Sequence, residues 1–189
     1  MPHPNHLTLS RIAALPPFAV LLYLPHDWTY PASAALFALA AATDWLDGHL
    51  ARRRNQQTPF GTFLDPVADK LLVTTALVLL IAKYPSPALT LAGLLIIGRE
   101  LTVTALREWM AQLGRHSTVA VSPLGKAKTA TQLIAIILLC LCQPGTSWAS
   151  LPLGTWGFNT GQALLYLATL LSLHSLAQYL KAALKSKPS

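Results

Sequence analysis

Charge is scarce in this 189-residue chain, and acidic charge is the scarcest. Only 11% of the residues are charged, about half the share of a typical soluble domain, and only seven are acidic. Hydrophobic residues make up 53% of the chain, and the mean hydropathy is +0.46. This composition argues against an ordinary water-soluble domain and indicates a protein that lies in lipid.

Internal repeats and low-complexity linkers are also missing, and the length fits one domain, so residues 1–189 are predicted to form a single membrane domain. The apolar residues come in long runs rather than in alternation, which favours helices of about 20 residues that cross a bilayer. We therefore predict an all-α integral membrane protein with six transmembrane helices. They are expected near residues 7–24, 31–53, 62–82, 88–110, 125–142 and 160–181.

The chain has only two cysteines, Cys140 and Cys142, which lie two apart in an apolar run and so point in different directions on a helix. We interpret them as buried hydrophobic residues rather than as a disulfide or metal pair. A cleaved signal peptide ending at the small residues 32–34 is the alternative for the N-terminus. It is disfavoured because Pro16 and Pro17 interrupt the apolar run.

Positive charge exceeds negative charge, giving a net charge of +7 and a pI near 9.7. In a soluble protein this excess would suggest nucleic acid, which we do not expect here, because six spans place nearly all basic residues on one side. The positive-inside rule makes that side, with both termini, cytoplasmic. The basic residues on this side are Arg11, Arg52, Arg53, Arg54, Arg107, Arg115, Lys126, Lys128, Lys181, Lys185 and Lys187; the opposite loops hold only Lys83.

Four of the seven acidic residues gather in one stretch, as Asp44, Asp47, Asp65 and Asp69. The first two are three residues apart and the last two are four apart, so each pair shares a helix face. Two antiparallel helices joined by a turn over residues 55–60 would aim all four carboxylates at one point. Carboxylates are costly at membrane depth, and oxygen ligands suit Mg²⁺ or Mn²⁺, so two divalent ions are predicted. An ion-pair cluster with residues 52–54 is the alternative.

Small residues accompany the acids. Gly48 and Ala51 remove bulk beside the first pair, so that a ligand can approach the backbone, and Arg52 can hold a phosphate oxygen. The helix after the turn is expected to begin around residues 61–65, with Pro66 near its start and the second acidic pair near its N-terminus. Two-metal sites of this kind bind phosphate oxygens during an in-line displacement.

The pattern D-x2-D-G-x2-A-R-x8-G-x3-D-x3-D is present in full, and it resembles the signature of the CDP-alcohol phosphotransferases. Its fixed positions are Asp44, Asp47, Gly48, Ala51, Arg52, Gly61, Asp65 and Asp69. Three further segments resemble the branch of that family which makes phosphatidylglycerophosphate. They are Asn5-His-Leu-Thr8-Leu-Ser-Arg11, Ala105-Leu-Arg107-Glu108-Trp109-Met-Ala, and residues 119–129.

The resemblance implies a six-helix membrane fold, commonly a homodimer, whose site opens to the cytoplasm. It implies transfer of a phosphatidyl group from CDP-diacylglycerol to sn-glycerol 3-phosphate, with release of CMP. By position, it makes Asp44, Asp47 and Asp65 metal ligands, and Asp69 the general base that takes a proton from the acceptor and also binds metal. The nucleotide-contacting positions implied are Asp44, Gly48, Ala51 and Arg52.

A dianionic acceptor needs cations on the cytoplasmic side of the membrane. Basic residues flank the connection between the fourth and fifth predicted helices, and we predict that Arg107, Arg115 and Lys126 bind the acceptor phosphate, with Ser122 adding a hydroxyl. Lys126 and Lys128 are two apart, so only one is expected to face the site. Adjacent Arg99 and Glu100 are interpreted as a buried structural pair.

Other functions remain open from the sequence. The acceptor could instead be inositol phosphate or serine, within the same chemistry. A divalent-cation transporter would carry acidic residues along a path that reaches both membrane faces, whereas the fifth and sixth predicted helices have none. A non-catalytic membrane scaffold would not explain why Gly48, Ala51 and Gly61 accompany the acids.

Overall fold

A computed structural model describes residues 4–54, 59–112, 123–144 and 152–185 of the chain. Within these ranges, side chains are described except at 4–7, 44–54, 59–63, 123–126, 152–153 and 182–185. The described part is helical and contains no strand. Its helices are α1 (Pro4–Ala13), α2 (Leu15–Tyr23), α3 (Thr29–Arg54), α4 (Pro59–Lys83), α5 (Pro87–Gln112), α6 (Pro123–Leu141) and α7 (Pro152–Lys185).

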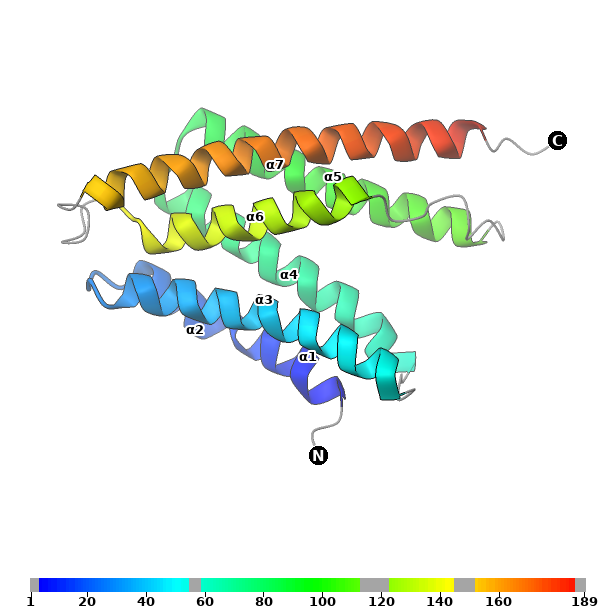
Figure 1. Cartoon of the computed structure of the whole chain (residues 1–189), viewed down its shortest axis with the longest axis horizontal. Coiled ribbons are helices and arrows are strands. Elements are labelled where there is room, and N and C mark those ends of the chain that lie inside the picture. Colours follow the sequence, from blue (N-terminus) through cyan, green and yellow to red (C-terminus); the bar gives the residue numbers. More distant parts are fainter. Residues whose placement is uncertain (1–3, 55–58, 113–122, 145–151, 186–189) are drawn as a thin grey trace.

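The helices form two groups with α4 between them (Figure 1). In the first group α1 and α2 pack on α3, and in the second α6 packs on α7 and α7 on α5. Helix α4 contacts α1 on one side and α5 on the other, and α3 also contacts α6. One continuous apolar core therefore links both groups. Its largest fully buried members include Phe18, Phe37, Leu77, Ile96, Ile136 and Leu165.

The first predicted helix is divided into α1 and α2 at Ala14. Pro16 and Pro17 lie in the first turn of α2 and carry no backbone N–H, so they cannot continue the hydrogen bonds of α1. A new helix can begin there without loss, because the first N–H groups of a helix have no partner within it. The break lets α1 take its own direction towards α4.

Helix α4 begins at Pro59, earlier than predicted, and Pro66 lies inside it rather than near its start. Pro59 takes the position where proline costs nothing, which leaves Asp65 as the seventh residue of the helix and Asp69 as the eleventh. The favourable field of a helix N-terminus fades within the first turn, so it does not hold these carboxylates as the sequence suggested. Other side chains hold them, as shown below.

Helices α6 and α7 approach closely at Gly161. A β-carbon at this position would lie 3.2 Å from the carbonyl oxygen of Ala135 and 3.0 Å from Cγ of Leu139. A larger residue here would require the neighbouring atoms of α6 to shift by a few tenths of an ångström, and a backbone oxygen moves less easily than the end of a flexible side chain. The approach fixes α6 against α7, and with it the position of Lys128 near the start of α6.

The surface is apolar in many places, with Leu94, Leu170 and Trp156 all more than 60% exposed. Large exposed apolar areas mark contact with membrane or protein. In the described residues, two helices are long and apolar enough to cross a bilayer, Pro87–Gln112 and Gly154–Lys181. The structure thus confirms the all-helical prediction, while six crossings stay a prediction.

A lysine and three tyrosines hold the other end of α4. The ammonium of Lys83 donates to the carbonyl of Leu22 and lies 4.8 Å from the ring centre of Tyr30. Beside it, the Tyr84 hydroxyl donates to Oε1 of Gln143 at 2.5 Å, while Tyr23 donates to the carbonyl of residue 79. These contacts join α2, α3 and α4 at the end of the molecule away from the acidic motif.

Candidate active site

The two halves of the acidic motif lie at the same end of the bundle. Helix α3 runs towards this end and α4 returns from it, and the two helices contact each other (Figure 1). The backbone of Asp44, Asp47, Gly48, Ala51 and Arg52 lies in the last half of α3, as predicted. The side chains of these residues lie outside the described part, so their roles in binding metal and nucleotide stay a prediction.

The first carboxylate of α4 is held by a hydroxyl from α1. Oγ1 of Thr8 donates to Oδ1 of Asp65 at 2.5 Å, and Thr8 is only 1% exposed. A buried threonine that donates to a carboxylate fixes both the position and the orientation of the acceptor group. Asp65 is thereby turned towards the same side of α4 as Asp69, four residues later.

The second carboxylate of α4 is paired with a buried arginine. Nη1 of Arg11 donates to Oδ1 of Asp69 at 2.8 Å. Arg11 is 1% exposed, while the Asp69 side chain is 44% exposed, so the carboxylate is open on one side. The planar guanidinium of an arginine holds a carboxylate in fixed geometry.

These two partners were not predicted as site residues. Thr8 and Arg11 are three apart on α1, and they meet two aspartates that are four apart on α4. The spacing of Thr8 and Arg11 was the one feature of the sequence that could have indicated a shared role, because residues three apart on a helix share a face. The sequence does not show that α1 packs on α4, so the match between the two helices could not be predicted.

A cavity of about 320 Å³ lies beside Asp69, between α4, α5, α6 and α7. Asp69 and Lys70 form part of its α4 wall, and α5 contributes residues from Ile96 to Arg107. Lys128 and Gln132 line it from α6, and Tyr179 lines it from α7. The cavity is large enough for a small polar molecule beside the exposed carboxylate.

The cavity carries more positive than negative side chains. Its cations are Lys70, Arg99, Arg107 and Lys128, and its acidic groups are Asp69 and Glu100. The cations therefore outnumber the carboxylates by two, which suits an anion with two negative charges. Low-dielectric walls strengthen such an attraction relative to water.

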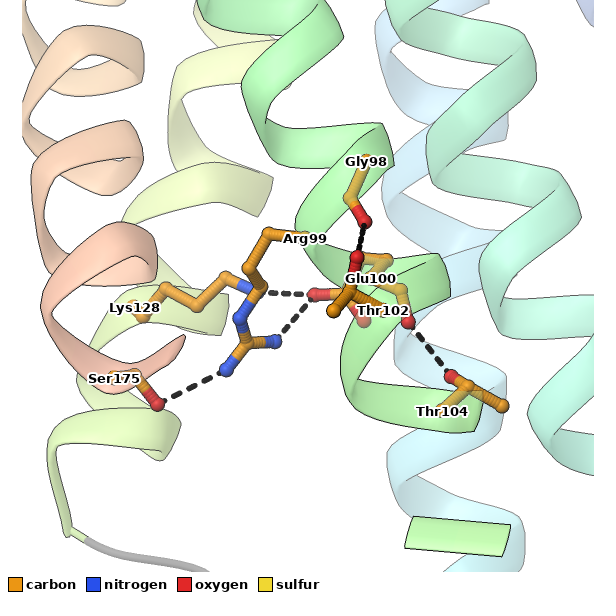
Figure 2. A network of polar contacts seen from close by, with 7 residues as sticks. All are labelled: Gly98, Arg99, Glu100, Thr102, Thr104, Lys128 and Ser175. Atoms are coloured by element: carbon orange, nitrogen blue, oxygen red, sulfur yellow. Dashed lines mark hydrogen bonds and ion pairs between the residues drawn. The ribbon is translucent and has the colours of Figure 1, made fainter. Parts of the chain in front are cut away.

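Three of the charged groups form one network across three helices (Figure 2). Arg99 of α5 donates from Nη1 to Oε1 of Glu100 at 2.9 Å and from Nη2 to Oγ of Ser175 in α7 at 3.0 Å. The ammonium of Lys128 in α6 donates to the same Oε1 of Glu100. The predicted pair of Arg99 and Glu100 is thus confirmed, with Arg99 buried, Glu100 only partly buried at 29% exposed, and Lys128 as a third member.

The structure describes only some of the residues predicted to bind the acceptor. Arg107 is exposed and lines the cavity. Lys126 lies in the first turn of α6, but its side chain is outside the described part, as are Arg115 and Ser122 altogether. Of the two lysines spaced two apart, Lys128 is described, and it faces the cavity. It was not selected from the sequence.

A divalent cation fits the donor chemistry of the motif. Asp65 and Asp69 offer carboxylate oxygens on one face of α4, which are the donors that Mg²⁺ and Mn²⁺ prefer. Among the described side chains, no group of three or more potential metal ligands occurs. The predicted set of four metal ligands also includes Asp44 and Asp47, whose side chains lie outside the described part.

The chain is similar in sequence to known phosphatidyltransferases. The chain is 50% identical over 182 residues to the CDP-diacylglycerol–glycerol-3-phosphate 3-phosphatidyltransferase of Pseudomonas fluorescens, covering 95% of this chain and 89% of that protein. It is 48% identical over 180 residues to the proteins of the same name in Salmonella typhimurium LT2 and Escherichia coli K12, covering 95% of this chain and 93% of each.

The sequence model of the CDP-alcohol phosphatidyltransferases matches residues 1–174, from α1 into α7. That family is embedded in membranes and depends on divalent metals. The match includes both halves of the acidic motif as well as Thr8, Arg11 and the cavity walls on α4, α5 and α6. The chain therefore belongs to the CDP-alcohol phosphatidyltransferase family.

Proposed function

We propose that this protein transfers the phosphatidyl group of CDP-diacylglycerol to sn-glycerol 3-phosphate, giving phosphatidylglycerophosphate and CMP. The main structural support is the position of Asp69, which is half-exposed at the wall of a cavity with a surplus of cations. The names of the similar proteins from Pseudomonas, Salmonella and Escherichia specify the same reaction.

The proposed metal ligands are Asp44, Asp47, Asp65 and Asp69, which would hold two divalent ions, Mg²⁺ or Mn²⁺. Bound ions would neutralise charge on the diphosphate and stabilise the CMP leaving group. Thr8 and Arg11 orient two of these carboxylates before substrate arrives. The nucleotide would contact Asp44, Gly48, Ala51 and Arg52, since the two small residues leave room beside the helix backbone.

In the proposed reaction, the acceptor hydroxyl oxygen attacks the β-phosphorus of the lipid diphosphate. The bond between that phosphorus and the bridging oxygen breaks, and CMP leaves with the bonding electrons. Asp69 takes the proton of the attacking hydroxyl as general base, for which its carboxylate must lie within hydrogen-bond reach. The contact with Arg11 Nη1 fixes the carboxylate in place, and its 44% exposed side chain gives the acceptor hydroxyl access to it.

The phosphate of the acceptor would bind to the basic residues of the cavity and its rim. Arg107, Arg115, Ser122 and Lys126 are the proposed ligands from the sequence. Lys128 joins them because its side chain lines the cavity. A dianionic acceptor suits this charge better than serine does, and family membership favours group transfer over cation transport or a scaffold.

We place the protein in the bacterial inner membrane, with the active site and both termini in the cytoplasm. The distribution of Lys and Arg supports this orientation. The acceptor is water-soluble and the donor is a lipid, so a site at the cytoplasmic end of the helices can reach both. A homodimer is proposed from the family resemblance alone.

The decisive experiment measures CMP release from CDP-diacylglycerol by the purified protein in detergent micelles. We expect release with sn-glycerol 3-phosphate and Mg²⁺ or Mn²⁺, no release after EDTA treatment, and recovery when the metal is restored. Inositol phosphate and serine serve as competing acceptors. Release with either of these, but not with glycerol 3-phosphate, would overturn the proposed acceptor; no release with any acceptor would overturn the transferase function.

A further inference from the structure

The carboxylate of Glu100 is shared by two cations that come from different helices. Its Oε1 accepts from Arg99 within α5 and from Lys128 of α6, and both cations are largely buried, at 8% and 3% exposed. Arg99 also donates to Ser175 of α7 (Figure 2), and it lies 6.0 Å from the ring centre of Tyr179. One acidic side chain thus connects three helices.

A buried ammonium needs a partner that keeps it in place. A charge in a low-dielectric site is costly unless it is paired and hydrogen-bonded. Glu100 is the acidic partner of Lys128 among the described side chains, and it is 29% exposed, so it lies between the buried cations and the open cavity. The contact with Glu100 thereby holds the Lys128 side chain at the cavity wall.

The ammonium of a lysine has three N–H donors. Lys128 directs one of them to Glu100, which fixes the direction of the other two. Lys128 and Glu100 both line the cavity that holds Asp69. An anion in this cavity can therefore accept from an ammonium whose position is already set.

We propose that Glu100 is a positioning residue for acceptor binding, which holds Lys128 at the cavity wall so that its ammonium binds the phosphate of the acceptor. Arg99, fixed by Ser175, in turn holds Glu100. The proposal rests on the proposed function, because it names a residue that prepares the acceptor side of the same site. Glu100 itself need not contact the substrate.

The carboxylate has two opposing effects on a phosphate, and they predict opposite results. As a nearby negative charge, Glu100 would repel the acceptor, and its removal would lower the KM for glycerol 3-phosphate. As a positioning residue, it makes Lys128 available, and its removal would raise that KM. The sign of the change therefore tests the proposal directly.

The experiment compares Glu100→Ala, Lys128→Ala and the double variant, with CMP release measured against glycerol 3-phosphate and CDP-diacylglycerol in turn. We expect each single variant to raise the KM for glycerol 3-phosphate about tenfold, as expected for loss of one charged hydrogen bond. The KM for CDP-diacylglycerol should stay unchanged. The double variant should match Lys128→Ala, because Glu100 acts through Lys128.

Two further variants separate positioning from a purely structural role. Glu100→Gln keeps an oxygen that can accept from Lys128, so it should raise the KM less than Glu100→Ala does, even if the alanine variant folds poorly. Thr102→Val is the matched control, because the Thr102 hydroxyl bonds to the carbonyl of Gly98 in the same helix and does not line the cavity. It should leave both KM values unchanged.

Three results would overturn the proposal. The first is a lower KM for glycerol 3-phosphate in Glu100→Ala or Glu100→Gln. The second is a double variant whose increase in this KM equals the product of the two single increases. The third is a lower melting temperature in Glu100→Gln with an unchanged KM. Absence of CMP release by the unaltered protein with glycerol 3-phosphate is a different result. It would overturn the proposed function itself, and the positioning role with it.

Discussion

Two side chains of α1 hold two carboxylates of α4, and each contact joins residues more than 50 positions apart in the chain. Thr8 reaches Asp65 and Arg11 reaches Asp69, with both α1 residues almost fully buried. Pre-oriented groups reduce the reorganisation that a reaction needs, because their positions are set before the substrate binds. The contacts therefore give α1, the first helix of the chain, a part in the site.

Asp69→Asn should abolish turnover while keeping binding of CDP-diacylglycerol. Asparagine has the shape of aspartate but cannot take the acceptor proton, and loss of a general base costs about 10²- to 10⁴-fold in rate. CMP release and binding of the CDP-lipid, measured on the same preparation, check this. An equal loss of binding would instead assign Asp69 mainly to the metal.

Arg11→Gln should lower kcat by about tenfold or more, because the Asp69 carboxylate loses a charged contact that fixes one of its oxygens. Arg11→Lys keeps the charge without the planar geometry and should recover only part of the activity. Steady-state kinetics and melting temperature, measured together, separate this effect from general destabilisation. Full activity in Arg11→Gln would show that the contact has no functional role.

At this scale, the sequence predicted the acidic residues but not the partners that hold them. The spacing of Asp65 and Asp69 is local to one helix, so periodicity alone places them on one face. Their contacts with Thr8 and Arg11, and that of Lys128 with Glu100, depend on which helices meet. Local spacing carries no information about such long-range contacts.

Helix packing decides which of the basic residues reach the cavity. Helix α6 packs along α7, with a close approach at Gly161, and it brings Lys128 to Glu100. Gly98 on α5 is different, because a β-carbon there would meet nothing within 4 Å. The two glycines thus offer a matched pair for testing how packing affects stability.

Gly161→Ala should destabilise the protein by about 1–3 kcal/mol, since the added methyl group would press on the Ala135 carbonyl. Gly98→Ala should be neutral or stabilising by up to about 1 kcal/mol, because alanine favours a helix more than glycine does. Unfolding of both variants in mixed micelles, followed by circular dichroism, gives the comparison. Equal stability of the two variants would contradict the close approach of α6 and α7.

The predicted helices agree with α3, α4, α5 and α6 to within a few residues at each end. Long apolar runs make such helices easy to recognise. The exceptions have local causes: two prolines divide the first helix, and α7 begins at Pro152 rather than near residue 160. Pro152, Gly154 and Gly157 interrupt the apolar residues at the start of α7, so the hydrophobic signal on which the prediction depends is weak there.

The whole molecule has basic residues concentrated at one end and a lysine–tyrosine cluster at the other. Lys83 lies beside Tyr30 at the far end of α4, while the cavity and its cations lie towards the start of α4. This asymmetry is what the positive-inside rule uses to assign orientation. It predicts that the turn between α4 and α5 faces the periplasm.

Cysteine labelling tests this orientation. In a Cys142→Ala background, which leaves the fully buried Cys140, Pro85→Cys and Gln112→Cys introduce exposed thiols at opposite ends of α5. A membrane-impermeant maleimide added to intact spheroplasts should label the first variant and not the second. Inside-out vesicles should give the reverse, and labelling of both variants from one side would contradict a membrane-crossing α5.

The surplus of positive charge around the cavity also bears on how the lipid product leaves. Phosphatidylglycerophosphate keeps the phosphate of glycerol 3-phosphate, so contacts that hold the acceptor would hold the product as well. Interactions that bind reactant and product alike do not accelerate the chemical step. Under the proposed function, we therefore expect the lipid product to compete with glycerol 3-phosphate for the cavity until it leaves into the bilayer.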